Sequence, residues 1–186
     1  MIHKCYKRIS GRISKFIYYV LKPLVSFVNY LSPRVATTMF VRLLKTCGVN
    51  MNGCPRFIST RIRIDEFSLI SIGEHSVISE NVILLTHDYS CTNALRLLKV
   101  LYPTDVSKHA SIKIGDNVFI GMGCIILPGT EIENNVIIGA GSVVKGHLKG
   151  NTVYAGNPLK PIKEMADYAA KVQNEMRKGL YDYRFD

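Results

Sequence analysis

The sequence predicts an all-β solenoid, a left-handed parallel β-helix with N-terminal helices and a short C-terminal helix. The first observation is a repeat of six residues, which from residue 114 reads IGDNVF, IGMGCI, ILPGTE, IENNVI, IGAGSV and VKGHLK. The second is that the same period occurs upstream, where residues 72–89 read IGEHSV, ISENVI and LLTHDY. An aliphatic residue at every sixth position cannot follow one side of an α-helix, but it can line the inside of a coil of short strands.

The repeat also explains the residues between the aliphatic positions. Three units make one triangular coil, and stacked coils lie about 4.8 Å apart and are joined by hydrogen bonds. Asp-Asn, Glu-Asn and Asn-Asn pairs and glycines recur in the units, and these residues tolerate the left-handed backbone that a tight corner needs. An ordinary β-sandwich is the competing interpretation. Five consecutive units in one register, from Ile114 to Val143, argue against it.

Three zones follow from the change of pattern along the chain. Residues 1–48 form a basic helical segment, residues 49–157 form the β-helix, and residues 158–186 read as a C-terminal helical segment. The repeat breaks at residues 89–113, which predicts an excursion loop that leaves the coil and returns to it.

Two helices are expected in the first zone. At the start of this zone, apolar residues recur at intervals of three and four residues, which predicts a helix. Pro23 is expected to end or kink that helix. A second helix has clear signals at its ends: Ser32 as the cap, Pro33 in the first turn and Gly48 beyond the last turn.

The composition of the chain limits the kinds of partner and the compartment that we expect. The formal net charge of +10 favours an anionic partner, but the basic residues do not form a stripe with aromatic residues, so nucleic acid is not expected. The five cysteines form no CxxC pair and no secretory signal is convincing, which favours the cytoplasm. Residues 1–31 have two interpretations. They either lie on the inner face of an anionic membrane or cap the open end of the first coil, and the cap is favoured.

The stretch IKIGDNVFIGMGCIILPGTEIENNVIIGAGSVV, followed by NTVYAGNP, resembles the hexapeptide-repeat acyltransferases. It is similar to the maltose and galactoside O-acetyltransferase group, and more so to bacterial O-acetyltransferases of capsule, exopolysaccharide and lipopolysaccharide synthesis. The resemblance implies a homotrimer with active sites between subunits. It also implies acetyl-CoA as the co-substrate, a sugar or glycan acceptor and no required metal.

The segment LLTHDYS resembles the place where this group carries its catalytic histidine, which makes His87 the candidate general base. Acetyl transfer from a thioester to a hydroxyl needs a base for the hydroxyl proton, and histidine suits that task near neutral pH. Asp88 is the candidate that orients His87, although a backbone carbonyl can do the same. Tyr89 and Ser90 are candidate contacts for the acceptor, and His109, at the end of the excursion, is a weaker candidate to line the site.

The resemblance also places the coenzyme. The expected contacts with acetyl-CoA are Met122, Ala140, Lys145 and Gly146, with Lys160 and Lys163 near the adenosine phosphates. Phe119 stands where the family often has tryptophan, and it is expected to keep an apolar wall beside the substrate without the indole N–H. The segment VKGHLKGN departs from the family's VTKDIPPN, which puts the contact at Gly146 in doubt.

The predicted function is therefore acetyl-CoA-dependent O-acetylation of a sugar or a surface-polysaccharide precursor, by direct attack without an acyl-enzyme. An antibiotic or other xenobiotic acceptor is the alternative within the same fold. Two other classes were weighed: a zinc hydratase, for which His75, His87 and His109 lack the close histidine pair, and a non-catalytic scaffold or binding solenoid.

Overall fold

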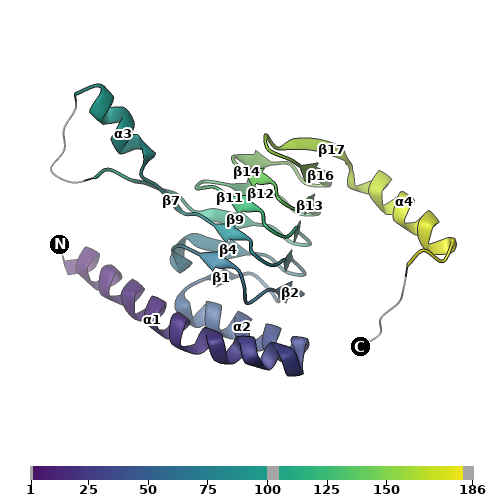
Figure 1. Cartoon of the computed structure of the whole chain (residues 1–186), viewed down its shortest axis with the longest axis horizontal. Helices are drawn as coiled ribbons and strands as arrows, with labels where there is room; N and C mark the ends of the chain where they lie inside the picture. The colour runs from purple at the N-terminus through teal and green to yellow at the C-terminus, as the bar shows by residue number, and fades with distance from the viewer. Residues whose placement is uncertain (1, 100–104, 182–186) are drawn as a thin grey trace.

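The structure is a computed structural model that describes residues 2–99 and 105–181, with side chains from Arg12 onward. Parts of the predicted N-terminal segment, excursion and C-terminal segment therefore lie outside the described residues. The coils stack along one axis, with two helices across the N-terminal end and one helix beyond the other end (Figure 1). The predicted fold class is confirmed.

The two N-terminal helices are α1 (Ile2–Leu31) and α2 (Pro33–Cys47). The signals at the ends of α2 act as predicted. The Ser32 hydroxyl accepts a hydrogen bond from the N–H of Val35 at 3.5 Å, and Gly48 closes the helix in a left-handed conformation with φ of 108°. α2 lies between α1 and the first coil (Figure 1), and Phe40 and Leu44 on its inner face are completely buried.

Pro23 was expected to end or kink the first helix. It does not end it, because α1 continues through this residue to Leu31, and a kink there stays a prediction. Proline removes one hydrogen bond inside a helix, which must be offset by other contacts. The inner face of α1 provides them. The ring of Tyr18 lies 6.2 Å from that of Phe40 and 4.9 Å from that of Phe67, so tertiary packing holds the helix across the proline.

The coil has three sheets of parallel strands. The first contains β1 (Asn50–Met51), β4 (Ile70–Ile72), β9 (Ile112–Ile114), β12 (Glu131–Ile132) and β15 (His147–Leu148). The second contains β2 (Phe57–Ile58), β5 (Val77–Ile78), β10 (Phe119–Ile120), β13 (Val136–Ile138) and β16 (Thr152–Ala155). The third contains β3 (Arg63–Ile64), β6 (Ile83–Leu84), β11 (Ile125–Ile126) and β14 (Val143–Val144). A 3-10 turn, η1 (Phe67–Leu69), widens the first coil.

The core is a set of aliphatic ladders inside this coil. Ile72 pairs with Ile114, Ile114 with Ile132 and Ile132 with Leu148, and all four are at most 3% exposed. The corners are formed by the predicted residue types. Asn117, for example, has φ of 52° and donates its side-chain amide to the amide oxygen of Asn135 on the next coil at 2.9 Å. The period of six therefore sets both the core and the corners.

The outward side chains differ among the three faces. The first face, outside the first sheet, is polar, with Asn50, Ser71, Lys113, Glu131 and His147 in register. The second face carries Phe57, Val77, Phe119, Ile137 and Val153. The third face carries Ile83, Ile125 and Val143 above Arg63. Two of the three outer faces are thus apolar.

The excursion is an antiparallel ribbon that carries a helix (Figure 1). It comprises β7 (His87–Asp88), α3 (Ser90–Leu97) and β8 (Lys108–His109), so it begins slightly before the predicted residue 89. The N–H of Ala110 donates to the carbonyl of Thr86 at 2.9 Å where the chain rejoins the coil.

The C-terminal segment contains one element that the sequence pattern did not predict. β17 (Lys160–Glu164) runs antiparallel to β16 and covers the edge of the second sheet, before α4 (Met165–Arg177) begins. The predicted short C-terminal helix is confirmed, but it begins later than the predicted helical segment, because residues 160–164 form the strand. Pairing with the free sheet edge outweighs the helical pattern there.

Candidate active site

His87 lies at the corner between the third and first sheets, where the chain leaves the coil. It follows β6 after the buried Thr86, and it pairs with His109 across the β7–β8 ribbon. Its side chain is 34% exposed, so one side of the ring is held by the protein and the other is open to a substrate.

The held side of the ring faces Asp65. This residue follows β3, which lies beside β6 in the third sheet, and Asp65 Oδ2 contacts His87 Nδ1. The same oxygen accepts hydrogen bonds from the Thr86 hydroxyl at 3.0 Å and the Thr86 N–H at 3.3 Å. A carboxylate only accepts hydrogen bonds, so Nδ1 carries the proton and Nε2 is left with its lone pair. This is the arrangement that a histidine base requires.

Asp88 lies beside His87 in the chain but serves another purpose. Its Oδ1 accepts a hydrogen bond from the N–H of Ser90 at 2.8 Å, at the start of α3. This bond lowers the pKa of the Asp88 carboxyl below its ordinary value. The orienting role expected for Asp88 therefore belongs, in this geometry, to Asp65. Neighbouring residues on a strand point to opposite faces, which explains why Asp88 does not share the environment of His87.

Two other rings lie near the ring of His87. The Tyr89 ring stands edge-on at 5.0 Å between centroids, and the His109 ring lies 5.8 Å away. His109 Nε2 is 2.9 Å from the Ser107 hydroxyl, which fixes this second ring. Tyr89 is about half exposed, so it is placed to touch a substrate, whereas the N–H of Ser90 is used by Asp88.

The residues expected to contact the coenzyme lie on both sides of the third face. Met122 and Ala140 lie at the corner between the second and third sheets, and Lys145 and Gly146 lie at the corner that also carries His87. Lys145 is close enough to Asp88 to contribute to the lowering of its pKa. The third face thus forms a wall between two rows of corner residues.

The space beside the backbone differs along the first of these rows. A Cβ added at Gly121 would lie 2.5 Å from the backbone nitrogen of Ala140, so the coils approach closely there. Gly141 has φ of 70° and leaves open space where a side chain would be.

Lys160 and Lys163 lie elsewhere. Both are exposed on β17, where Lys160 pairs with Ala155 and Lys163 with Val153 at the edge of the second sheet. In a single chain they are therefore not beside Lys145, and a coenzyme would have to extend along the molecule to reach them.

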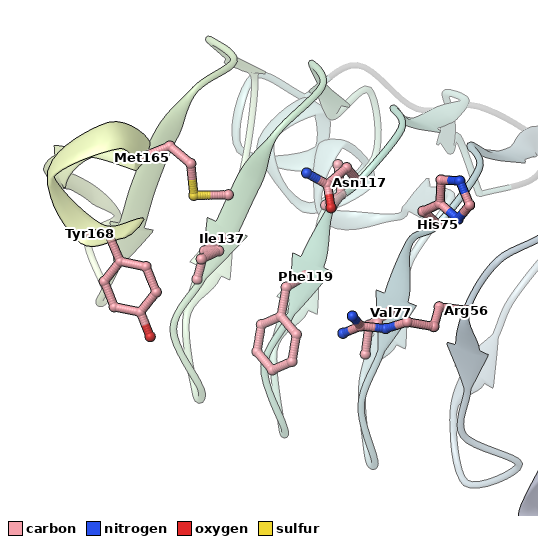
Figure 2. Close-up of a pocket in the computed structure, with 9 residues that line it drawn as sticks. Arg56, His75, Val77, Asn117, Phe119, Ile137, Met165 and Tyr168 are labelled. Carbon is pink, nitrogen blue, oxygen red and sulfur yellow. The ribbon is translucent and has the colours of Figure 1, made fainter. Parts of the chain in front are cut away.

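Phe119 is also separate from His87 in one chain, since it projects from the second face. It borders a cavity of about 250 Å³ together with Ile137, Met165 and Tyr168 on one side and Arg56 and His75 on the other (Figure 2). His75 belongs to this cavity and not to the corner of His87 and His109. Among the side chains of residues 12–99 and 105–181, no group of three His, Cys, Asp or Glu residues is placed to hold a metal ion.

Sequence reasoning missed Asp65, which is the residue that completes the pair.

The fold and this site define a solenoid protein with a histidine–carboxylate pair at a break in the coil. Comparison with known proteins agrees. The sequence model of the bacterial transferase hexapeptide family (six repeats) matches residues 111–146. Protein CapG of Staphylococcus aureus is 38% identical over 131 residues, which cover 69% of this chain and 73% of CapG. The chain belongs to the hexapeptide-repeat transferase family.

Other relatives match over a smaller share of their length. WbbJ of Escherichia coli, named as a candidate lipopolysaccharide biosynthesis O-acetyl transferase, is 32% identical over 58% of this chain and 56% of its own. The galactoside O-acetyltransferase of Escherichia coli is 34% identical over 56% of this chain and 48% of its own. The chain thus spans about half the length of these two curated relatives.

Solved structures show the same fold. A galactoside acetyltransferase in complex with coenzyme A superposes with a TM-score of 0.61 at 22% identity, over 96% of this chain and 86% of that one. A hexapeptide-repeat acetyltransferase from Vibrio cholerae, complexed with acetyl coenzyme A, has a TM-score of 0.54 at 22% identity, over 63% and 60%.

Proposed function

We propose that this protein is an O-acetyltransferase that moves the acetyl group of acetyl-CoA to a hydroxyl of a sugar or a surface-polysaccharide precursor. The observation that carries the proposal is the pair of His87 and Asp65 at the mouth of the excursion. The names of the relatives WbbJ and galactoside O-acetyltransferase support the reaction class.

In the proposed reaction, Nε2 of His87 takes the proton of the acceptor hydroxyl as its oxygen attacks the thioester carbonyl. The carbon–oxygen bond forms and the carbon–sulfur bond breaks. The proton then passes from His87 to the thiolate of coenzyme A, so no oxidant or other reactant is needed. Asp65 keeps Nδ1 protonated and stabilises the positive ring while it exists. Because the acceptor attacks directly, no nucleophilic side chain is required.

The donor would lie along the third face, between the two rows of corner residues. The reactive thioester has to reach His87 from that side, which agrees with the expected contacts at Lys145 and Gly146. Lysine suits a phosphate or carbonyl oxygen as a point charge. Met122 and Ala140 would border the other side of the arm.

We also propose that three copies assemble around a common axis. The third face exposes Ile125 and its neighbours, the second face exposes Phe119, and the first face is polar. Cyclic assembly joins two different faces of each subunit, here the second face of one copy to the third face of the next. The His87 corner of one subunit would then meet Phe119 of its neighbour, so the site is complete only between subunits.

The acceptor is proposed from the ribbon that covers the site. The rings of Tyr89 and His109 lie near the ring of His87, and aromatic rings of this kind pack against the apolar side of a sugar while hydroxyls bind polar groups. The lipopolysaccharide named for WbbJ favours a glycan over a small xenobiotic.

The test is release of the coenzyme A thiol from acetyl-CoA by purified protein, measured against a panel of sugars, glycans and hydroxylated antibiotics. We expect acceptor-dependent release that falls at least ~100-fold in His87→Ala. His147→Ala is the matched control, because this histidine is exposed on the polar first face. Coenzyme binding without turnover would call for a wider panel. Absence of coenzyme binding, or full activity of His87→Ala, would contradict the proposal.

A further inference from the structure

The charges of this protein are distributed very unevenly along the chain. Residues 1–64 contain twelve lysines and arginines and no aspartate or glutamate, so half of the 24 basic residues and none of the 14 acidic ones lie there. The first carboxylate in the sequence is Asp65, which belongs to the catalytic pair. The remainder of the chain carries the other twelve basic residues against all fourteen acidic ones, and is slightly negative.

The same region exposes a continuous apolar stripe on α1. Its members recur at intervals of three and four, which places them on one side of a helix. Their exposed fractions are 54% for Ile13, 71% for Phe16, 55% for Val20, 57% for Leu24, 62% for Phe27 and 75% for Leu31. We call these six residues the outer stripe. The opposite side of α1 already packs through Tyr18 and Val25, which are at most 4% exposed, so the stripe is not needed for the core.

The cap interpretation of residues 1–31 is thus correct for the inner side of α1 and leaves the outer side unexplained. α1 is the outermost layer at the N-terminal end of the solenoid (Figure 1). Six large apolar side chains in one exposed row are uncommon on a monomeric surface and mark a site of interaction.

Positive side chains are also exposed on both N-terminal helices. Arg12 and Lys15 are exposed on α1, and Arg34, Arg42 and Lys45 are exposed on α2. Among the described residues of this region, the one ion pair with a carboxylate joins Arg61 to Glu80, at 3.0 Å. An apolar partner without negative charge would match the stripe but would offer these cations no anionic group to bind.

We propose that the outer stripe of α1 lies on an anionic phospholipid surface, with the helix in the plane of the interface. A helix that combines an apolar row with Lys and Arg and no acidic residue binds such a surface in two ways. Its apolar side chains are buried among the lipids, and its positive charges are attracted to the anionic headgroups. Among the described helices, none is long and apolar enough to cross a membrane, so the contact is peripheral. The proposal stands independently of the transfer reaction, because none of these residues touches the His87 site.

The experiment is co-sedimentation of the full chain with vesicles of phosphatidylcholine alone and with vesicles that also contain phosphatidylglycerol. We expect binding to the anionic vesicles only, weakened by added salt. Phe16→Ser and Phe27→Ser should each weaken it about tenfold. Arg12→Gln and Lys15→Gln should each weaken it about fivefold, because one positive charge at such a surface contributes about that much.

Leu180→Ser and Lys178→Gln are the matched controls, since they make the same changes on exposed residues near the C-terminus. Circular dichroism checks the fold of each variant. If the phenylalanine variants unfold, the two charge variants decide the question.

Three results would overturn the proposal: equal binding to both kinds of vesicle, binding to neither, or variants that bind like the unchanged protein. A fourth concerns a second copy of the chain. If the phenylalanine variants have a smaller molar mass in solution without lipid, the stripe is a contact between copies.

Discussion

Asp65→Asn is the most direct perturbation of the proposed catalytic pair. The amide oxygen of asparagine can accept the hydrogen bonds that Asp65 Oδ2 accepts from Thr86 and from Nδ1 of His87. The opposite orientation would set an NH₂ group against the Thr86 N–H, so it is disfavoured. The substitution therefore keeps the tautomer and position of His87 and removes only the negative charge.

The size of the effect follows from the charge that forms on His87 during the reaction. Two unit charges 4 Å apart attract by about 1 kcal/mol in water and by about 4 kcal/mol at an effective dielectric constant of 20. The side chains of His87 and Asp65 are 34% and 18% exposed, so the pair lies between these limits. The imidazolium is present in the transition state and absent from the ground state. A loss of about 2 kcal/mol then lowers kcat by roughly 30-fold.

The assay is thiol release at saturating acetyl-CoA and acceptor. Asp65→Asn should lower kcat and leave the KM for acetyl-CoA unchanged, and Asp65→Ala, which also frees the ring, should lower kcat further. Asp88→Asn makes the same chemical change on the neighbouring carboxylate, which contacts Ser90, and it should stay within a few-fold of the unchanged protein. A large loss in Asp88→Asn together with little loss in Asp65→Asn would refute the assignment.

The remaining predictions concern stability and assembly. Tyr18 is 2% exposed and its hydroxyl has no hydrogen-bond partner among the described residues, so Tyr18→Phe should raise the free energy of unfolding in urea by about 1 kcal/mol. Unchanged or lower stability would show that the hydroxyl is satisfied. Ile125→Glu on the third face should yield monomers in light scattering, while Lys113→Gln on the polar face should keep the trimer mass. The pKa of Glu133 is lowered, chiefly by the Gly150 N–H, so its contribution to stability is present above the ordinary value of 4.5 and is lost as the pH falls. Glu133→Gln should therefore reduce the fall of Tm on acidification, and an identical fall in both proteins would contradict this.

The fold could be predicted from the sequence because its physical rule is local. Each unit of six places one aliphatic residue inside and one small or polar residue at a corner, so Ile114, Ile132 and Asn135 can be assigned without knowing their neighbours. The ends of α2 follow from single residues for the same reason. Pro23 shows the limit, because contacts of Tyr18 with Phe40 and Phe67 overrule a local signal.

The proposed catalytic pair was only half predictable. His87 lies in the last unit before the repeat breaks, but Asp65 comes before a stretch in which the period fails, where η1 lengthens the coil. The pairing of Ile64 with Leu84 is what brings Asp65 next to His87, and no period of six in the sequence gives that register. The separation of Phe119 from His87 depends on which face each residue occupies, and this needs the closed coil.

The ribbon of β7 and β8 is joined to the solenoid at a narrow base, where Ala110 bonds to Thr86. The groups that hold His87, namely Asp65 and Thr86, belong to the coil, whereas Tyr89, α3 and His109 belong to the ribbon. Evolution can therefore lengthen, shorten or replace the ribbon without disturbing His87 or its orientation. Such modularity lets one catalytic frame serve many acceptors, and grafting ribbons between relatives is a direct way to redesign which acceptor is modified.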